Sequence, residues 1–405
     1  MKICGIIAEY NPFHNGHAYQ VEQLRAQGFT HIIALMSSNF VQRGEAALLS
    51  KHRRALAAIC SGVDLVLEFP LPYCASTAQK FASSGVDILE KLACIDGIGF
   101  GCEHNNMEKV RELCKFLDSD KLDKIIKDSL ATGITYAKAR HRAVLDVMGL
   151  EYANLIAEPN DILAVEYIRA LTKIKSKIVP VPILRTGVSH DSREPSGNIA
   201  SASFIRSALL NGQLETIEKY VPGDSYRIIA ADVKRKRCPA TLNNCERAVL
   251  CKLRELTDEQ YPLIPDFSEG LENRIQDKVK SSHTIIKLID SVKTKRYTHA
   301  RIKRIILHSF LGITKSDFAP ITSVRILGLG DKGEELVSLI SKKSKLAVYG
   351  KYNEVKFLDE NSRRIFELED HAYDLFSLCT PRVMPCNQNK TNRIVSLREN
   401  EKNEN

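Results

Sequence analysis

The sequence predicts an α/β protein in which a parallel sheet is followed by a mainly helical C-terminal region. Short apolar runs alternate with helix-like segments through the first half of the chain, and helical periodicity dominates beyond about residue 240. Strands that alternate with helices in this way form βαβ units, whose strands lie parallel. The length of 405 residues is too great for one hydrophobic core and implies two or three domains.

Five segments have the composition of buried parallel strands, which are short runs of β-branched and other apolar residues. They span residues 3–9, 31–36, 63–69, 95–101 and 177–183. Helical patterns separate the first four strands and occupy residues 16–27, 50–61 and 77–92. A first strand that leads through a tight turn into a helix is typical of a Rossmann-like sheet.

The connection between the fourth and fifth strands is predicted to be helical. Residues 107–117 have helical periodicity, and residues 120–149 show no strand pattern and are interpreted as two inserted helices. A further helix is expected over residues 160–173, with Asn160 as its N-cap after Pro159.

We place a domain boundary near residue 240, which divides the chain into residues 1–240 and 241–405. The pattern changes over residues 221–237, and the segments that follow are helical apart from a βαβ-like piece at 323–348. The polar residues 387–405 are expected to be frayed.

The bulk composition is that of an ordinary globular protein, with 44% apolar and 26% charged residues. No segment approaches the roughly 18 uninterrupted apolar residues of a membrane span. The N-terminus enters a strand pattern directly, without the layout of a signal peptide. A cytoplasmic location is therefore expected. The net charge of +9 is compatible with a polyanionic partner.

The eleven cysteines do not have the spacing of a metal site or a disulfide framework. The sequence contains no CxxC pair, and Cys60, Cys94 and Cys114 lie in apolar runs. The cysteines are therefore expected to be small core residues, and no protein metal ligands are predicted.

The strongest functional signal is the HxGH pattern of His14, Gly16 and His17, directly after the first strand. Helix N-terminal N–H groups bind phosphate, and Gly16 lets the backbone approach the ligand closely. Two imidazole donors can stabilise the charge that develops on the β- and γ-phosphates as pyrophosphate leaves. The structural alternative is a pair of surface histidines at a helix start, which the preceding Asn-Pro-Phe makes less convincing.

A second signal is the segment 199–206, in which Ser203 and Arg206 stand at the start of a helix. Hydroxyls and an arginine within one turn form an anion cradle. Alone, the segment is better explained as an ordinary Ser-capped helix with a surface arginine. Together with HxGH it resembles the HIGH-type nucleotidyltransferase superfamily, whose members carry HxGH and an Ile-Ser-Ser-Thr-like motif ending in Arg. The resemblance implies that His14, His17, Ser203 and Arg206 are catalytic.

Longer segments resemble the bacterial tRNA(Met) cytidine acetate ligase family. The similarity covers most of residues 1–310 and is most specific in the block 36–45, with Ser38 and Ala46 as small departures. The matching segments are residues 9–17, 36–45, 62–70, 159–167 and 295–298.

The resemblance implies that the protein activates acetate with ATP and transfers the acetyl group to N4 of the wobble cytidine of elongator tRNA(Met). Mg²⁺ is expected to accompany ATP. The implied ATP contacts are Ile7, Ala8, Glu9, Tyr10, Asn11, Pro12, Phe13, His14, Asn15, Gly16, His17, Gly101, Asn160 and Arg185. A turn glycine, an N-cap and a surface arginine are the structural alternatives for the last three.

The clearest RNA-binding candidate is the run 287–304, in which seven basic residues stand against one acid, Asp290. Tyr297 and His299 are candidate stacking groups, although a solvated helix face would also explain the run. The basic residues are Lys287, Lys293, Lys295, Arg296, Arg301, Lys303 and Arg304. A smaller cluster, Lys51, Arg53 and Arg54, is expected to hold phosphate of ATP or tRNA.

Two other functions are compatible with parts of the sequence. A small-molecule nucleotidyltransferase of the NMN or phosphopantetheine adenylyltransferase type would use the same ATP motifs but leaves the C-terminal half unexplained. A non-catalytic RNA-binding protein with a degenerate ATP fold is disfavoured by the intact His14, His17, Ser203 and Arg206.

Overall fold

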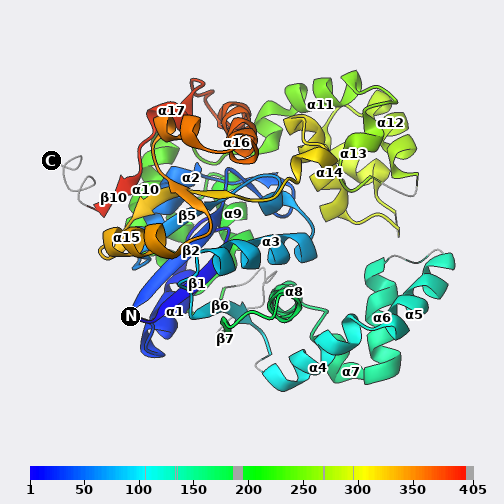
Figure 1. The fold of residues 1–405 in the computed structure, drawn as a ribbon. Coiled ribbons are helices and arrows are strands. Elements are labelled where there is room, and N and C mark those ends of the chain that lie inside the picture. The colour runs from blue at the N-terminus through cyan, green and yellow to red at the C-terminus, as the bar shows by residue number, and fades with distance from the viewer. Residues whose placement is uncertain are drawn as a thin grey trace.

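The structure, a computed structural model, describes residues 1–104, 106–132, 134, 136–185, 195–267, 270–294 and 296–397. Its centre is an eight-stranded sheet, in which seven strands have the order β10-β8-β5-β2-β1-β6-β7 and the eighth, β9, pairs with β8 (Figure 1). The five predicted strands are all present, as β1 (Ile3–Ala8), β2 (His31–Ser37), β5 (Leu65–Phe69), β6 (Gly97–Cys102) and β7 (Val179–Leu184). They pair in parallel throughout, and the predicted α/β fold class is confirmed.

Helices cover both faces of this sheet. On one face, α1 (Asn15–Ala26) and α2 (Lys51–Cys60) contribute Val21, Leu24 and Ile59 to a core with the apolar residues of β1 and β2. On the other face, α3 (Ala78–Lys91) packs against α8 (Pro159–Lys173), and both belong to the larger core. Buried strands of this kind read as continuous apolar runs, which is why the sequence pattern located them.

The long connection from β6 to β7 is helical, as predicted. It comprises α4 (Met107–Leu117), α5 (Asp120–Ala131), α6 (Tyr136–Met148), α7 (Leu150–Asn154) and α8. The prediction that Asn160 caps α8 is wrong. Glu158 holds the N-cap position and Pro159 the first helical position, where its missing N–H costs no hydrogen bond. The Asn160 side chain is thereby released for another contact.

The sheet contains strands from both sides of the predicted boundary at residue 240. The chain leaves the sheet through α9 (Ala202–Leu210) and α10 (Gly223–Lys234) and returns as β8 (Ser323–Leu329), which pairs antiparallel with β5. The βαβ-like piece is β8, α15 (Gly333–Lys343) and β9 (Ala347–Tyr349). This return depends on pairing between distant segments, which local periodicity does not encode.

A helical module lies between α10 and β8 in the sequence. It comprises α11 (Glu246–Glu255), α12 (Leu271–Ser281), α13 (Ile285–Val292) and α14 (His299–Leu311), and it stands apart from the α4–α7 group in Figure 1. The C-terminal elements are α16 (Glu360–Leu378), α17 (Gln388–Thr391) and β10 (Val395–Ser396). Residues 388–396 are thus not frayed, because β10 pairs with β8 and Asn389 is buried.

No disulfide joins the cysteines that the structure describes, and most of them are buried. Within the described ranges, no group of three or more His, Cys, Asp or Glu side chains is arranged to hold a metal ion. Over the same ranges, no helix combines the length and the apolar character that crossing a bilayer would require.

Candidate active site

The candidate active site is a pocket at the carboxyl ends of β1, β6 and β7. The chain turns from β1 toward β2 on one side and later enters β6 on the other, so the pocket lies at the switch point of the sheet, where nucleotides bind in folds of this class. The predicted residues that line it are Ile7, Ala8, Glu9, Tyr10, Asn11, His14, Gly16, His17, Gly101, Asn160, Arg185 and Arg206. Pro12, Phe13, Asn15 and Ser203 are not among the lining residues.

The turn after β1 has a constrained backbone. Tyr10 has a φ of +47°, which is uncommon for a residue other than glycine. Its ring is buried and lies edge-on to His17, with centroids 4.9 Å apart, and Phe13 supports the same cluster from the core. Strained backbone of this kind is found where the surrounding structure holds a site in place.

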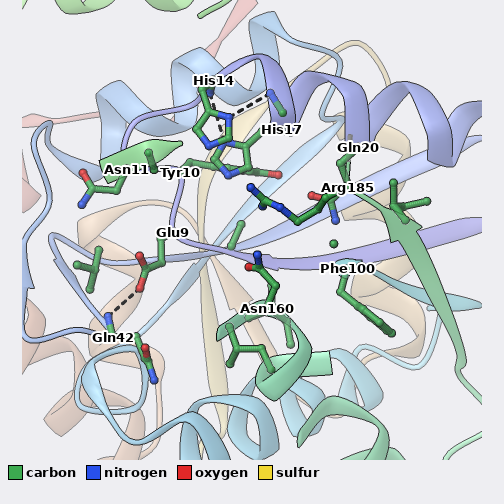
Figure 2. Close-up of a pocket in the computed structure, with 18 of the residues that line it drawn as sticks. Glu9, Tyr10, Asn11, His14, His17, Gln20, Gln42, Phe100, Asn160 and Arg185 are labelled. Atoms are coloured by element: carbon green, nitrogen blue, oxygen red, sulfur yellow. Dashed lines mark hydrogen bonds between the residues drawn. The ribbon is translucent and has the colours of Figure 1, made fainter. Parts of the chain in front are cut away.

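His14 and His17 form a reciprocal cap at the start of α1. The Gly16 N–H donates to His14 Nδ1 at 3.1 Å, and the His14 N–H donates to His17 Nδ1 at 3.2 Å. The rings stack with centroids 3.7 Å apart (Figure 2). Because each Nδ1 accepts a hydrogen bond, each neutral ring carries its proton on Nε2. Both histidines are therefore fixed in the tautomer that can donate to a phosphate oxygen.

The second predicted motif is brought to the same place. The Asn15 side chain donates to the carbonyls of Asn198 (2.7 Å) and Lys219 (3.0 Å), which ties the start of α1 to the chain around α9. Arg206 reaches the turn after β1, where its Nη1 donates to the Asn11 carbonyl at 3.2 Å. HxGH and Arg206 thus share one pocket.

Ser203 takes a different place from the one expected of a phosphate ligand. Ser201 is the N-cap of α9 and accepts from the Phe204 N–H at 3.1 Å, while the Ser203 hydroxyl lies 2.9 Å from that of Ser201. The residue of this segment that lines the pocket beside Arg206 is Ala202, together with Ile199 before the helix.

Gly101, Asn160 and Arg185 come together at the ends of β6 and β7. Glu103, which the sequence analysis did not single out, joins two of them. It accepts from Asn160 Nδ2 at 3.0 Å and pairs with Arg185 Nε at 3.1 Å. Asp161 in turn accepts from the Glu103 N–H at 2.8 Å, which anchors α8 to the end of β6. No local motif marks Glu103, because its role depends on residues far along the chain.

A third part of the pocket contains both acidic and basic side chains. We define the acceptor arm as Glu9, Gln42, Arg43 and Glu45, the last three of which lie on the hairpin of β3 (Phe40–Val41) and β4 (Glu45–Ala46). Glu9 Oε1 accepts from the Gln42 N–H at 2.9 Å, as Figure 2 shows. Glu45 pairs with Lys303 of α14 at 2.5 Å. The arm therefore connects the ATP motifs to the helical module.

The pKa values of Glu9 and Glu45, the two carboxylates of the acceptor arm, are shifted in opposite directions. Burial raises the pKa of Glu9, and the Gln42 N–H and the charges of Arg206 and Arg43 only partly oppose it. Burial also acts to raise the pKa of Glu45, but the charge and hydrogen bond of Lys303 outweigh it and leave this pKa below its usual value.

The expectation that Lys51, Arg53 and Arg54 hold phosphate is wrong. Lys51 and Arg54 are fully buried, and Arg53 pairs with Asp232 at 3.3 Å. Lys51 contacts the carboxylates of Glu68 and Glu369. Arg54 instead donates to backbone carbonyls, including that of Glu9 at 2.6 Å. These cations organise the protein interior beneath the pocket.

The structure buries some residues of the basic run 287–304 and leaves others exposed. Arg304 is buried and pairs with Asp266 at 2.7 Å, and Arg301 donates to the Asp266 carbonyl at 3.0 Å. Tyr297 is also buried, which removes it as a stacking platform for a base. The exposed members are Lys287, Lys293, Arg296 and His299. Lys295 lies outside the described residues.

Comparison with known proteins places this geometry in a family. The chain matches the family described as HIGH Nucleotidyl Transferase over residues 1–392. It is 38% identical over 387 residues to the tRNA(Met) cytidine acetate ligase of Caldanaerobacter subterraneus subsp. tengcongensis, with 93% of this chain and 95% of that protein covered. The tRNA(Met) cytidine acetate ligase of Acetivibrio thermocellus is 33% identical over an alignment of 415 residues, with 98% and 100% covered.

Two crystal structures of Thermotoga maritima TmcAL resemble the whole chain. The apo form superposes with a TM-score of 0.93, and the form bound with alpha-thio ATP superposes with a TM-score of 0.91. Both are 30% identical in sequence, and each comparison covers 98% of this chain and 100% of the other.

Proposed function

The chain belongs to the HIGH nucleotidyl transferase family, and from this premise we propose that it is a tRNA(Met) cytidine acetate ligase. It activates acetate as acetyl-adenylate and transfers the acetyl group to N4 of the wobble cytidine of elongator tRNA(Met). The observation that carries the proposal is the convergence of His14, His17 and Arg206 on one pocket whose remaining arm is tied to the helical module by Glu45 and Lys303. Relatives that match 93% and 98% of this chain carry that name.

The first half-reaction uses positioning and charge. Acetate is already ionised, so its attack on the α-phosphorus of ATP needs no general base. The pyrophosphate that leaves is held by the α1 N-terminus, by the Nε2 donors of His14 and His17 and by Arg206. The adenosine occupies the part of the pocket formed by Gly101, Asn160 and Arg185. Asn160 and Arg185 are preorganised there by their contacts with Glu103.

A Mg²⁺ ion that accompanies ATP would take its ligands chiefly from phosphate oxygens and water. The described part of the chain holds no cluster of carboxylates or imidazoles suited to a resident metal. Glu9 and Glu45, the acidic residues of the pocket, are engaged by Gln42 and Lys303. The protein's own share of charge stabilisation is therefore assigned to His14, His17 and Arg206.

We further propose that tRNA docks on the exposed basic residues of the helical module, Lys287, Lys293 and Arg296. A cytoplasmic location is part of the same proposal, because tRNA is found there. Electrostatic contact with phosphates from this surface supplies affinity, while the acceptor arm receives the target nucleotide. Because the wobble base is single-stranded in the anticodon loop, it can enter a pocket without opening a duplex.

The function is tested by two measurements on the full-length protein. Acetate should stimulate ATP–pyrophosphate exchange without RNA, and radiolabelled acetate should then appear in tRNA(Met) as N4-acetylcytidine. Mass analysis of tRNA nucleosides from cells that lack the protein should show loss of that nucleoside. If nicotinate mononucleotide or phosphopantetheine drives the exchange and acetate does not, the protein is a small-molecule nucleotidyltransferase instead.

A further inference from the structure

The acceptor arm contains two carboxylates, and their surroundings give them different chemistry. Glu45 is neutralised by Lys303, whose ammonium lies 2.5 Å from Oε1. Glu9 has no lysine or arginine in a close ion pair within the described residues, and its Oε1 accepts a backbone N–H from Gln42. Oε2 is then the Glu9 oxygen that remains to meet a substrate. Two carboxyl groups with environments this different serve different roles.

The position of Glu9 in the pocket suits the acyl acceptor. In an in-line displacement the entering acetate approaches the α-phosphorus from the side opposite the leaving pyrophosphate. Figure 2 shows the Glu9 side chain turned away from His14 and His17, toward Gln42, with Arg185 on the other side of the pocket. The acetyl group of acetyl-adenylate is therefore expected on the Glu9 side.

The backbone of Glu9 is held firmly. Arg54, which is fully buried, donates to the Glu9 carbonyl at 2.6 Å and to the carbonyls of Leu49 and Ser38. The strained φ of Tyr10 fixes the direction of the chain immediately after it. A carboxylate on so rigid a support keeps its orientation toward the acceptor without help from the substrate.

The hairpin opposite Glu9 also lies against the helical module. A Cβ added to Gly44 would stand 2.4 Å from the Arg304 amide nitrogen, so the two backbones are in direct contact. A nucleotide delivered by tRNA that is docked on the module would thus enter beside Gln42 and Glu9. This entry is separate from the histidines that hold the triphosphate.

We propose that Glu9 is the proton acceptor in the acetyl-transfer half-reaction, a role that rests on the proposed function. The cytidine N4 lone pair attacks the carbonyl carbon of acetyl-adenylate, and a C–N bond forms. The bond between that carbon and the phosphate oxygen breaks, and AMP leaves with the electron pair. N4 loses one proton to Glu9 Oε2, which becomes a carboxylic acid and later returns the proton to solvent. The products are N4-acetylcytidine, AMP and one proton.

The electrostatics agree with this assignment. Burial raises the pKa of Glu9, which makes its carboxylate a better proton acceptor than an exposed one. Lys303 holds the pKa of Glu45 low and makes it a poor one. The charges of Arg43 and Arg206 act on both carboxylates, and at Glu9 they oppose the effect of burial and favour the ionised form that a base requires.

The test compares Glu9→Gln with wild type in both half-reactions. Removing a general base costs about 10²–10⁴ in rate, so single-turnover acetyl transfer to tRNA(Met) should fall by that factor. ATP–pyrophosphate exchange driven by acetate should also fall, because Glu9 lines the ATP pocket, but by a smaller factor than transfer. Wild-type transfer should lose rate as pH drops through the Glu9 pKa, and E9Q should lack that acidic limb. Glu22→Gln, an exposed residue of α1 outside the pocket, serves as the matched control.

Three outcomes overturn the proposal. Equal losses of exchange and transfer in E9Q would make Glu9 a structural or ATP-binding residue. An unchanged acidic limb in E9Q would assign the proton to another group. If the wild-type protein exchanges ATP with acetate but never acetylates tRNA, the proposed function fails first and this role falls with it. Thermal unfolding of E9Q shows whether the variant is folded, and Glu9→Asp, which keeps the carboxylate, should retain part of the transfer rate.

Discussion

At the scale of single residues, the pocket depends on hydrogen-bond direction more than on residue identity. A histidine can donate from either ring nitrogen, and only the second partner determines which. The Gly16 and His14 N–H groups make that choice here, because each occupies an Nδ1. The same contacts that cap α1 therefore prepare two Nε2 donors for phosphate.

We expect His17→Ala to lower acetate-dependent ATP–pyrophosphate exchange by about 10²–10³, the usual effect of removing one preorganised donor. The variant also loses the acceptor for the His14 N–H, which costs stability by about 1 kcal/mol and leaves the protein folded. Exchange kinetics and thermal unfolding measure the two effects separately. His371→Ala, an exposed histidine of α16, should change neither. Near wild-type exchange in H17A would remove His17 from the mechanism.

The sequence predicted these residues unevenly. HxGH is a local pattern after a strand, and its two histidines do lie in the pocket with Arg206. Glu103 could not be predicted, since nothing in its neighbourhood shows that Asn160 and Arg185 converge on it. Lys51 and Arg54 were wrongly predicted to bind phosphate. Their place in the sequence near the motif suggested that role, and only the structure shows that both side chains are buried.

At the scale of elements, periodicity located the strands and helices but not the strand partners. Local apolar runs are sufficient to mark β1, β2, β5, β6 and β7, whose neighbours follow from βαβ connectivity. The antiparallel pairing of β8 with β5 joins one strand that precedes the helical module in the sequence to one that follows it. The short β3–β4 hairpin was also missed, since two-residue strands carry no measurable periodicity.

Gly44 of the β3–β4 hairpin and Gly28 after α1 have nearly the same backbone conformation. Gly44 has a φ of +76° and Gly28 a φ of +84°, so an alanine at either position is strained by about 1–2 kcal/mol. A Cβ at Gly28 meets no atom within 4 Å, whereas at Gly44 it meets the Arg304 amide nitrogen at 2.4 Å.

Gly44→Ala should therefore destabilise the protein by about 1–3 kcal/mol more than Gly28→Ala does, because two backbones must separate. Chemical denaturation of both variants measures the difference. We also expect G44A to lose more tRNA acetylation than G28A, because the hairpin carries Gln42 of the acceptor arm. Equal stability losses would show that the hairpin and α14 adapt to each other freely.

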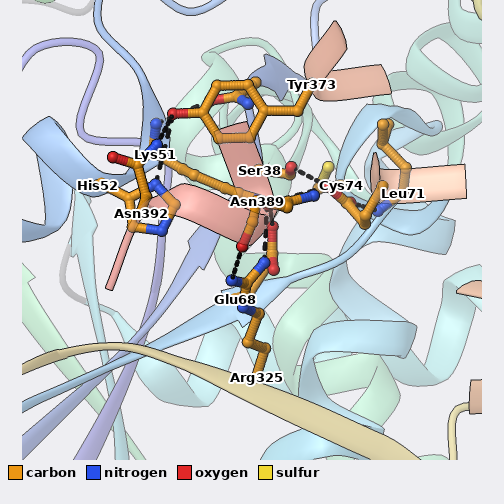
Figure 3. Close-up of polar contacts among 12 residues, drawn as sticks. Ser38, Lys51, His52, Glu68, Leu71, Cys74, Arg325, Tyr373, Asn389 and Asn392 are labelled. Carbon is orange, nitrogen blue, oxygen red and sulfur yellow. Dashed lines mark hydrogen bonds and ion pairs between the residues drawn. The ribbon is translucent and has the colours of Figure 1, made fainter. Parts of the chain in front are cut away.

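At the scale of the whole molecule, the C-terminal elements are fixed to the sheet by a buried polar network (Figure 3). Lys51 of α2 contacts Glu68 of β5 and Glu369 of α16, and the Leu71 N–H donates to Glu369 at 2.6 Å. Arg325 of β8 donates to Asn389 at 2.7 Å. Removing one member of such a network leaves a buried charge or donor unpaired, which costs more than the pair gains.

This network gives stability a pH dependence. Burial, and then the negative charge of Glu68, raises the pKa of Glu369 from 4.5 to about 7. The folded protein thus holds a proton that the unfolded chain releases near pH 4.5, so stability from this group is complete below that pH and is lost as pH rises toward 7. The melting temperature of Glu369→Gln, which has no proton to lose, should decline less than that of wild type between pH 5 and 7.5. Parallel profiles would mean that Glu369 does not titrate there.

The proposed tRNA-docking surface and the ATP pocket are formed by different residues. None of the exposed basic residues Lys287, Lys293 and Arg296 lines the ATP pocket. Replacing all three with glutamine should weaken binding of tRNA(Met), because each lost phosphate contact lowers the slope of log affinity against log salt by roughly 0.7–0.9. The slope should fall by about 2 if all three residues contact phosphate. Acetate-dependent ATP–pyrophosphate exchange should continue.

The matched control is Lys342→Gln with Lys343→Gln, two exposed lysines of α15, which lies away from the helical module in Figure 1. This pair removes positive charge without removing the proposed contacts, so its salt slope should stay near that of wild type. Filter binding at several salt concentrations and exchange assays on the same preparations give both quantities. Equal loss of binding and exchange in the triple variant would mean that these residues support the fold. Unchanged tRNA affinity would mean that tRNA docks on another face of the protein. That face would not be the cluster of Lys51 and Arg54, because both side chains are buried.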